Sequence, residues 1–298
     1  MCSSDLKVLV VGANGMLGHA LMEACARLGD VEGADLPRLD ITDAETTRRF
    51  VEAARPAIVV NAAAMTDVDG CEADPGAAFA VNARGAGNVA DACLAVRARL
   101  VHVSTDYVFD GLKGSPYTED DPVNPASVYG RSKRDGEEEV RRSRADFLIV
   151  RTSWLFGAHG KNFVDTILRA AETRGELEVV GDQRGCPTYA RDLAGALCRL
   201  AAAGLGGLIH AANSGVCSWF DYARAILEIA GIGGVAVRET TSDRLNRPAP
   251  RPPCSALDCG RYAAFAGAPM RHWREAVAGY LAERVRPGAG GSDRKSVV

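Results

Sequence analysis

A glycine string limits the fold of this chain more than any other feature. Residues 12–18 read Gly-Ala-Asn-Gly-Met-Leu-Gly, and they directly follow the apolar run 7–11. Apolar residues at helical spacing come next, so the pattern predicts a strand, a tight turn and a helix. In that order, Gly12 permits the turn, Gly15 lets backbone N–H groups approach a pyrophosphate, and Gly18 lets the helix pack closely. The string has the spacing G-x-x-G-x-x-G, which an ordinary glycine turn also satisfies. We predict that it binds a dinucleotide through Gly12, Asn14, Gly15, Met16, Leu17 and Gly18.

The end of a second predicted strand, residues 31–34, carries Asp35. A carboxylate there can accept hydrogen bonds from an adenosine ribose. Asp40 and Ile41 follow and suit the edge and face of an adenine. The charge of Asp35 would repel a 2′-phosphate and favours NADH, whereas Arg38 is close enough in sequence to offset it. The sequence therefore predicts NADH or NADPH as the cofactor.

Strand-like runs alternate with helical patterns as far as residue 155. Further strands are predicted at 57–61, 100–104 and 147–152, and helices at 44–54, 75–96 and 129–141. Such alternation is typical of an α/β fold of Rossmann type, with a doubly wound parallel sheet. Ligands bind beyond the carboxyl ends of the strands in these sheets, which is where Gly12, Asp35, Ala62–Ala64, Thr105 and Trp154 fall.

The chain becomes less regular after residue 155, which suggests a second lobe. We predict a dinucleotide-binding domain at 7–155, which residues 191–215 rejoin. Residues 156–190 and 216–284 are predicted to form a smaller, interleaved substrate-binding lobe. The ends, 1–6 and 286–298, are predicted to be disordered or non-native.

Tyr129 and Lys133 lie four residues apart, on one face of a predicted helix. A nearby ammonium lowers the pKa of a phenol, so Tyr129 could act as the general acid in carbonyl reduction. Lys133 would also hold the nicotinamide ribose, and Thr105 would polarise the carbonyl oxygen. An exposed helical pair has the same spacing, but the glycine string and the strand-end Thr105 favour catalysis.

Composition excludes several other functions. The net charge of −3 and the pI near 6.0 argue against nucleic acid or an anionic membrane as the main partner. No run of 18 apolar residues is present, and the N-terminus lacks the pattern of a secretory signal. Nine cysteines without a C-x-x-C pair indicate free thiols in the cytoplasm, and the scattered histidines predict no metal site.

Several longer strings resemble a known family, among them VVGANGMLG, IVVNAAAMTDVDGCE, VHVSTDYVFDG, PVNPASVYGRSK and IVRTSWLFG. From about residue 7 to 284 the chain resembles the extended short-chain dehydrogenase/reductases, and within them the dTDP-4-dehydrorhamnose reductase family. The resemblance implies NAD(P)H-dependent reduction of the 4-keto group of dTDP-4-dehydro-β-L-rhamnose to dTDP-β-L-rhamnose. It implies that Thr105, Tyr129 and Lys133 are catalytic. It also places Asn82 and Ala62, Ala63 and Ala64 at the cofactor, and Thr66, Val68, Thr105, Asp106, Tyr107 and Trp154 at the nucleotide sugar.

Two positions depart from the family pattern. Some relatives bind magnesium between subunits through two glutamates, and the matching positions here are Ala20 and Arg191, so no magnesium site is expected. Cys254 stands where the family has an asparagine, which leaves substrate contacts around Arg247 and Ser255 open.

Two other functions are compatible with the sequence. The chain could reduce another nucleotide 4-keto-deoxysugar, or it could be a non-catalytic NAD(P)-binding regulatory subunit like that of methionine adenosyltransferase. Intact Thr105, Tyr129 and Lys133 favour catalysis. A monomer and a homodimer are both compatible with the sequence.

Overall fold

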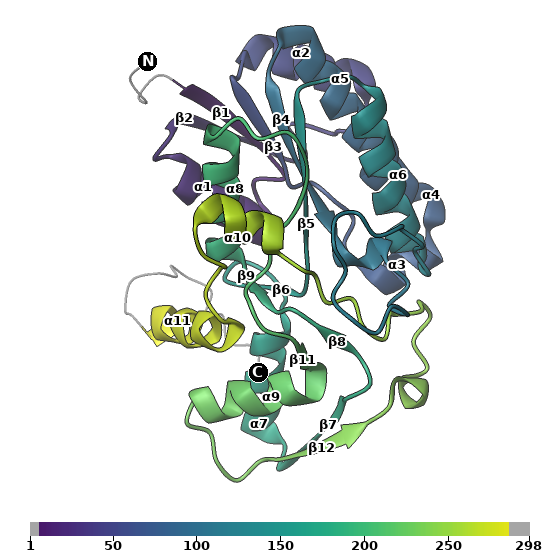
Figure 1. The fold of residues 1–298 in the computed structure, drawn as a ribbon, viewed down its shortest axis with the longest axis vertical. Coiled ribbons are helices and arrows are strands. Elements are labelled where there is room, and N and C mark those ends of the chain that lie inside the picture. Colours follow the sequence, from purple (N-terminus) through teal and green to yellow (C-terminus); the bar gives the residue numbers. More distant parts are fainter. Residues whose placement is uncertain (1–5, 286–298) are drawn as a thin grey trace, which may run out of the picture.

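A six-stranded parallel sheet forms the centre of the computed structural model, which describes residues 6–285 of the 298-residue chain (Figure 1). The strand order β10-β5-β4-β3-β1-β2 reverses direction beside β1, as in a doubly wound sheet. This confirms the predicted α/β, Rossmann-type fold. The strands are β1 (Leu6–Val11), β2 (Gly29–Ala34), β3 (Ile58–Asn61), β4 (Arg99–Thr105), β5 (Phe147–Thr152) and β10 (Gly207–His210).

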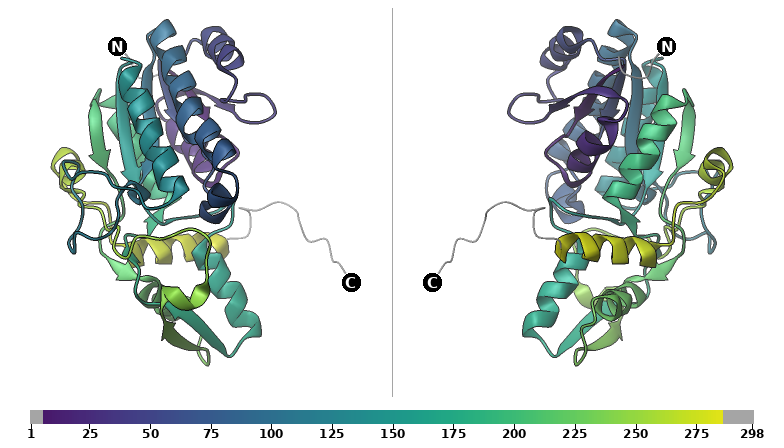
Figure 2. Two further views of the ribbon diagram at one scale, coloured as in Figure 1. Left: turned by 90° about the vertical axis from the view of Figure 1, so that its right-hand side faces the viewer. Right: turned by 90° about the vertical axis from the view of Figure 1, so that its left-hand side faces the viewer.

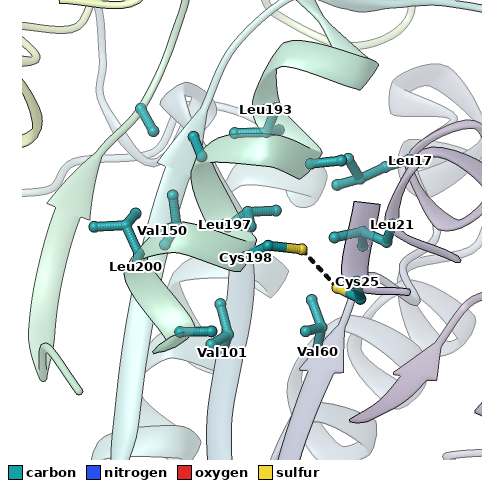
Figure 3. Packing of buried hydrophobic residues seen from close by; sticks show 14 of the residues in the cluster. Leu17, Leu21, Cys25, Val60, Val101, Val150, Leu193, Leu197, Cys198 and Leu200 are labelled. Carbon is teal, nitrogen blue, oxygen red and sulfur yellow. Dashed lines mark hydrogen bonds between the residues drawn. The ribbon is translucent and has the colours of Figure 1, made fainter. Parts of the chain in front are cut away.

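Helices cover both faces of the sheet, because its strands are apolar on both sides. One face packs against α1 (Met16–Cys25) and α8 (Ala190–Ala202), and the other against α2 (Ala44–Ala54), α5 (Ala86–Val96) and α6 (Val128–Arg142). Figure 3 shows Leu17 and Leu21 of α1 beside Leu193 and Leu197 of α8, over the central strands. The same layer contains the buried free cysteines Cys25 and Cys198, whose sulfur atoms lie 2.6 Å apart. The phosphate-turn helix is thus fixed by packing against a helix from the second half of the chain.

The register of the sheet brings the ends of the strands together. Val11 pairs with Asn61, and Thr105 pairs with Thr152. The residues that follow these strands therefore meet at one edge of the sheet, where the sequence places the candidate site.

The predicted single helix at 75–96 is wrong in detail. The chain forms α4 (Pro75–Phe79), a π-helical segment (Ala80–Gly85) and then α5. Asn82 lies in the π-helical segment, where its side chain bonds both to the N–H of Met65 at 2.9 Å and to the carbonyl of Met65 at 3.0 Å. A π-helical turn is wider than an α-helical one, and here the Asn82 amide reaches the loop that contains Met65. A short helix in that region, α3 (Val68–Ala73), was not predicted; Asp67 caps it.

A second layer lies at the carboxyl end of the sheet (Figures 1 and 2). It contains α7 (Phe163–Thr173), α9 (Trp219–Ile229) and α11 (Trp273–Val285), with the parallel pair β7 (Glu176–Val180) and β12 (Ala236–Thr240). Aromatic side chains, among them Phe156, Tyr222 and Tyr280, fill its core. Short strand pairs join it to the sheet: β6 (Leu155–Phe156) with β9 (Thr188–Tyr189), and β8 (Arg184–Gly185) with β11 (Cys217–Ser218). A last helix, α10 (Gly260–Ala266), packs near β10.

The proposed segments 191–215, 156–190 and 216–284 can be located in this fold, although the division into two lobes stays a prediction. Residues 191–215 contribute most of α8 and all of β10, which pairs with β5. Leu6, which belongs to the end predicted to be disordered or non-native, is the first residue of β1. The other residues of the two predicted ends, 1–5 and 286–298, lie outside the described residues. Between Leu6 and Val285, no helix has the length and apolarity to cross a membrane.

Candidate active site

The glycine turn after β1 is shaped by contacts that leave no room for side chains. Gly12 has φ +83°, and a Cβ atom on it would lie 2.6 Å from the backbone nitrogen of Ala63. A Cβ on Gly18 would lie 2.6–2.7 Å from backbone atoms of Ala13. Gly15 differs, because a Cβ there would make only an ordinary contact of 3.4 Å within the protein. Gly15 instead lines two cavities, so its missing side chain leaves space for a ligand.

The first cavity has a volume of about 300 Å³, and residues predicted to bind the adenosine end of the cofactor line it. The Asp35 carboxylate at its wall accepts a hydrogen bond from the N–H of Asn14 at 2.9 Å. Arg38 contacts Glu32 at 2.5 Å and the carbonyl of Gly33 at 3.2 Å, so its charge is already paired beside the cavity. Predicted cofactor residues that line this space are Gly12, Gly15, Asp35, Asp40, Ile41, Ala62, Ala63 and Ala64.

The second cavity, about 420 Å³, shares Gly15, Ala62 and Ala64 with the first. It reaches from the glycine turn to the ends of β4 and β5. A dinucleotide that binds along both spaces would therefore place its second half here. Predicted residues on its wall are Met16, Leu17, Gly18, Thr66, Val68, Thr105, Asp106, Tyr107, Tyr129, Lys133 and Trp154.

Helix α6 presents Tyr129 to this cavity. Ser127 caps the helix by accepting from the N–H of Gly130 at 3.1 Å, and Gly130 lets the helix approach the carbonyl of Tyr107. The rings of Tyr107 and Tyr129 meet edge to face, with centroids 5.5 Å apart. Burial raises the pKa of Tyr129, although a hydrogen bond with Thr105 lowers it. The phenol therefore holds its proton at neutral pH, ready to donate.

The expected lowering of the Tyr129 pKa by Lys133 is not seen. The Lys133 ammonium donates instead to the carbonyl of Val103 at 2.8 Å, on β4. Lys133 is only 2% exposed, and burial lowers its pKa to about 8, while Glu137 raises it. Its charge is thus set by a balance between burial and one carboxylate.

Thr105 and Asp106 form the floor of the site at the end of β4. The Thr105 hydroxyl accepts from the N–H of Tyr107 at 3.2 Å and donates to Oδ1 of Asp106 at 3.0 Å. The hydroxyl of Ser255 donates to the other carboxylate oxygen. Burial raises the pKa of Asp106 to about 7, against these hydrogen bonds, which lower it. Ser255 therefore reaches the site even though its neighbour Cys254 departs from the family pattern.

Trp154 is an aromatic part of the wall of the same cavity. It has φ +45°, and its ring stacks on Trp219 of α9 with centroids 3.6 Å apart and planes 5° from parallel. Gly185 leaves room for the Trp154 ring. Trp219 lines the cavity as well, so the two stacked indoles together form its aromatic part.

Comparison with known proteins identifies the chain. The family model described as the RmlD substrate binding domain matches residues 6–286. The chain belongs to this family. It is 44% identical over 279 residues to the spore coat polysaccharide biosynthesis protein SpsK of Bacillus subtilis, covering 93% of this chain and 98% of that one. It is 45% identical to the dTDP-4-dehydrorhamnose reductase of Mycolicibacterium smegmatis, covering 91% and 84%. The crystal structure of dTDP-4-dehydrorhamnose reductase from Bacillus anthracis in complex with NADP has a TM-score of 0.90 at 38% identity, covering 93% and 99%.

Asn82 and Asn14, which the sequence also assigns to the cofactor, line neither cavity of this RmlD-family site. Asn82 is 1% exposed and lines neither cavity; it donates to the hydroxyl of Ser132 at 3.0 Å and thereby joins the π-helical segment to α6. Asn14 is exposed and contributes its backbone N–H to Asp35.

The two positions that match the magnesium ligands of some relatives hold no metal-ligand cluster. Arg191 pairs with Glu23 at 2.5 Å and Glu283 at 2.8 Å, and Ala20 lies on α1. Over residues 6–285, no three His, Cys, Asp or Glu side chains come together as metal ligands.

Sequence reasoning missed several cavity residues. Thr152 ends β5 and Ser153 follows it directly, so their strand-end position was a usable signal. Trp219 and Lys161 come from the second layer, and nothing in their local sequence distinguishes them from core or surface residues.

Proposed function

We propose that this protein is an NAD(P)H-dependent reductase that converts the 4-keto group of dTDP-4-dehydro-β-L-rhamnose to the alcohol of dTDP-β-L-rhamnose. The observation that carries the proposal is one cavity wall that combines Thr105, Tyr129 and Lys133 with the glycine turn. A bound nicotinamide would supply the hydride for the carbonyl carbon. The NADP complex of the Bacillus anthracis relative supports the cofactor class.

Each catalytic residue has a separate task. Tyr129 gives its phenolic proton to the carbonyl oxygen, and its raised pKa ensures that the proton is present. The Thr105 hydroxyl, which donates to Asp106 in this structure, turns toward the substrate, donates a hydrogen bond to the same oxygen and stabilises the developing negative charge. Lys133, as an ammonium, stabilises the phenolate that remains and holds the nicotinamide ribose.

The substrate would lie between the polar floor and the indole wall. Asp106 and Tyr107 border the floor, and Thr66 and Val68 lie on the wall beside α3. The Trp154 ring offers an apolar face to the C–H groups of a sugar. This arrangement suits a neutral sugar ring whose keto group points to Tyr129.

The proposal is tested by turnover of freshly prepared nucleotide 4-keto sugars with NADPH and NADH. We expect reduction of the dTDP-4-keto-6-deoxy sugar to be fastest. Preference for another keto sugar would change the substrate assignment. Absence of turnover with the whole panel, together with co-purification of a methionine adenosyltransferase, would support the regulatory-subunit alternative.

Tyr129→Phe tests the catalytic assignment itself. It should lower kcat by roughly 10²–10⁴, the usual share of a positioned general acid, while leaving cofactor affinity near wild type. Tyr107→Phe removes a hydroxyl from the same cavity and is the matched control, with a loss below about tenfold. Near-normal turnover by Tyr129→Phe would refute the role of the phenol.

A further inference from the structure

Glu137 is a buried carboxylate directly behind the candidate catalytic residues. It lies on α6, one helical turn after Lys133, so both side chains are on the same face of the helix. The Glu137 side chain is fully buried and lines neither cavity of the site. A carboxylate in such a place needs partners, because burying an unpaired charge is very unfavourable.

Its partners come from the two strands that end at the site. The hydroxyl of Ser104 donates to Oε1 at 2.6 Å. Arg151 donates to Oε1 through Nε at 2.8 Å and to Oε2 through Nη2 at 2.7 Å. Ser104 directly precedes Thr105, and Arg151 directly precedes Thr152. One carboxylate therefore ties α6 to the last residues of β4 and β5.

Stability alone is a weak reason for this arrangement. Replacing a buried ion pair by apolar residues of similar volume is often neutral or stabilising, since desolvation of the two ions offsets their attraction. Arg151 is 2% exposed, so both members of the pair have lost their water. The position beside Lys133 suggests a role in the charge of the site.

The groups that surround the Lys133 ammonium give it one negative neighbour. Burial lowers the Lys133 pKa and Glu137 raises it. His102 on β4 is neutral, because burial and Lys133 both lower its pKa, and Tyr129 is a neutral phenol. Arg151 and Arg141 are both paired with Glu137. Removing the carboxylate would take away the negative charge that raises the Lys133 pKa, and it would leave the buried Arg151 guanidinium without this partner.

We propose that Glu137 is a positioning residue for the reaction: it keeps Lys133 positively charged and fixes the strand ends that carry Ser104 and Arg151. The inference rests on the proposed reductase function. A neutral Lys133 could neither stabilise a phenolate nor donate as strongly to the cofactor ribose. The carboxylate thus acts on the chemistry through Lys133, without touching the substrate.

The test compares Glu137→Gln with Glu137→Asp across pH. Gln keeps the shape and removes the charge, whereas Asp keeps the charge and shortens the side chain. The reaction requires a charged Lys133, which exists only below its pKa of about 8. We therefore expect kcat/KM to fall as pH rises through that value. Loss of a nearby carboxylate should move this decline down by about one pH unit. We expect Glu137→Gln to be roughly five-fold less active than wild type at pH 8 and within two-fold at pH 6.

Glu137→Asp should keep the wild-type pH dependence. Glu138→Gln is the matched control, since Glu138 is the next residue on α6, is exposed and, within residues 6–285, forms an ion pair only with Arg141. Binding of NADP⁺, measured by calorimetry, gives a readout independent of turnover. We expect the ratio of the NADP⁺ affinity of Glu137→Gln to that of wild type, both measured at the same pH, to be lower at pH 8 than at pH 6. Titration of the cofactor itself and of Asp106 cancels in that ratio.

The possible contrary results are distinct. An equal loss at pH 6 and pH 8 in Glu137→Gln, or the same pH shift in Glu137→Asp, would overturn the charge role. If Glu137→Gln fails to fold, the double variant Glu137→Gln/Arg151→Met leaves no unpaired guanidinium at this position. Because it also removes the positive charge of Arg151, it should show a smaller shift in the same downward direction, and no shift would overturn the charge role. If wild type turns over no keto sugar, the proposed function fails, but the pH dependence of NADP⁺ binding still decides the role of Glu137.

Discussion

Asp106 makes stability depend on pH in a direction opposite to most carboxylates. It is 2% exposed, and burial raises its pKa from 3.8 to about 7 in the folded chain. Between these values the unfolded chain has lost the proton while the folded chain retains it. Unfolding therefore releases a proton, and stability falls as pH rises through this window. This decrease in the free energy of unfolding begins above pH 3.8 and is complete above pH 7.

The magnitude follows from the two pKa values. From pH 5 to pH 7 the group should reduce the free energy of unfolding by about 2 kcal/mol. For a chain of this size, with an unfolding entropy of about 2.1 cal/mol/K per residue, such a change corresponds to roughly 3 °C in Tm. Asp106→Asn cannot ionise but keeps an oxygen and a donor for Thr105 and Ser255, so it should lack this decrease.

Urea unfolding of wild type and Asp106→Asn at pH 5 and pH 7 measures the effect. We expect the variant to gain about 2 kcal/mol relative to wild type between the two pH values. Asp91→Asn, an exposed position on α5, is the control and should follow wild type. Equal pH dependence in wild type and Asp106→Asn would show that Asp106 is ionised in the folded protein across this range and would refute the reasoning.

The elements of the sheet were predictable because local signals and burial agree there. The helix at 44–54 and the strand at 147–152 have the predicted bounds. Asp43 caps that helix by accepting from the N–H of Thr46, a signal present in the sequence. Continuous apolar strands between such helices permit only a parallel sheet covered on both faces.

Other elements depend on contacts between distant segments. The π-helical segment at 80–85 exists where Asn82 reaches Met65, which a helical pattern cannot reveal. The pair β7 and β12 joins residues about sixty positions apart, and β12 is mostly exposed, so it lacks a strand-like apolar pattern.

The candidate site also has one part that the sequence predicts and another part that depends on contacts between distant segments. Parallel strands end at a common edge, so Thr105 and the residues after β3 and β5 could be placed together from the sequence. Trp219 lines the cavity and Ser255 bonds to Asp106 on its wall because segments from the second half of the chain pack against that edge. Their contributions follow from tertiary structure alone, which explains why substrate contacts are harder to predict than the cofactor turn.

Three further perturbations test the cofactor site. Activity should survive EDTA and show no gain with added magnesium; a loss that only magnesium restores would mean that metal ligands were missed. Gly18→Ala should destabilise the fold by about 1–3 kcal/mol in thermal or urea unfolding, because its Cβ would lie 2.6–2.7 Å from backbone atoms of Ala13. Gly15→Ala should spare stability and weaken NADP⁺ binding, because its Cβ would make only an ordinary 3.4 Å contact with the carbonyl of Gly12 and would extend into the cavities. Asp35 should give a modest preference for NADH, since two like charges about 4 Å apart repel by roughly 4 kcal/mol at an effective dielectric near 20. Arg38 is engaged by Glu32 and offsets only part of that repulsion. Asp35→Ala should therefore raise the ratio of kcat/KM for NADPH to that for NADH. A strong wild-type preference for NADPH, or an unchanged ratio in the variant, would show that Asp35 does not face the ribose.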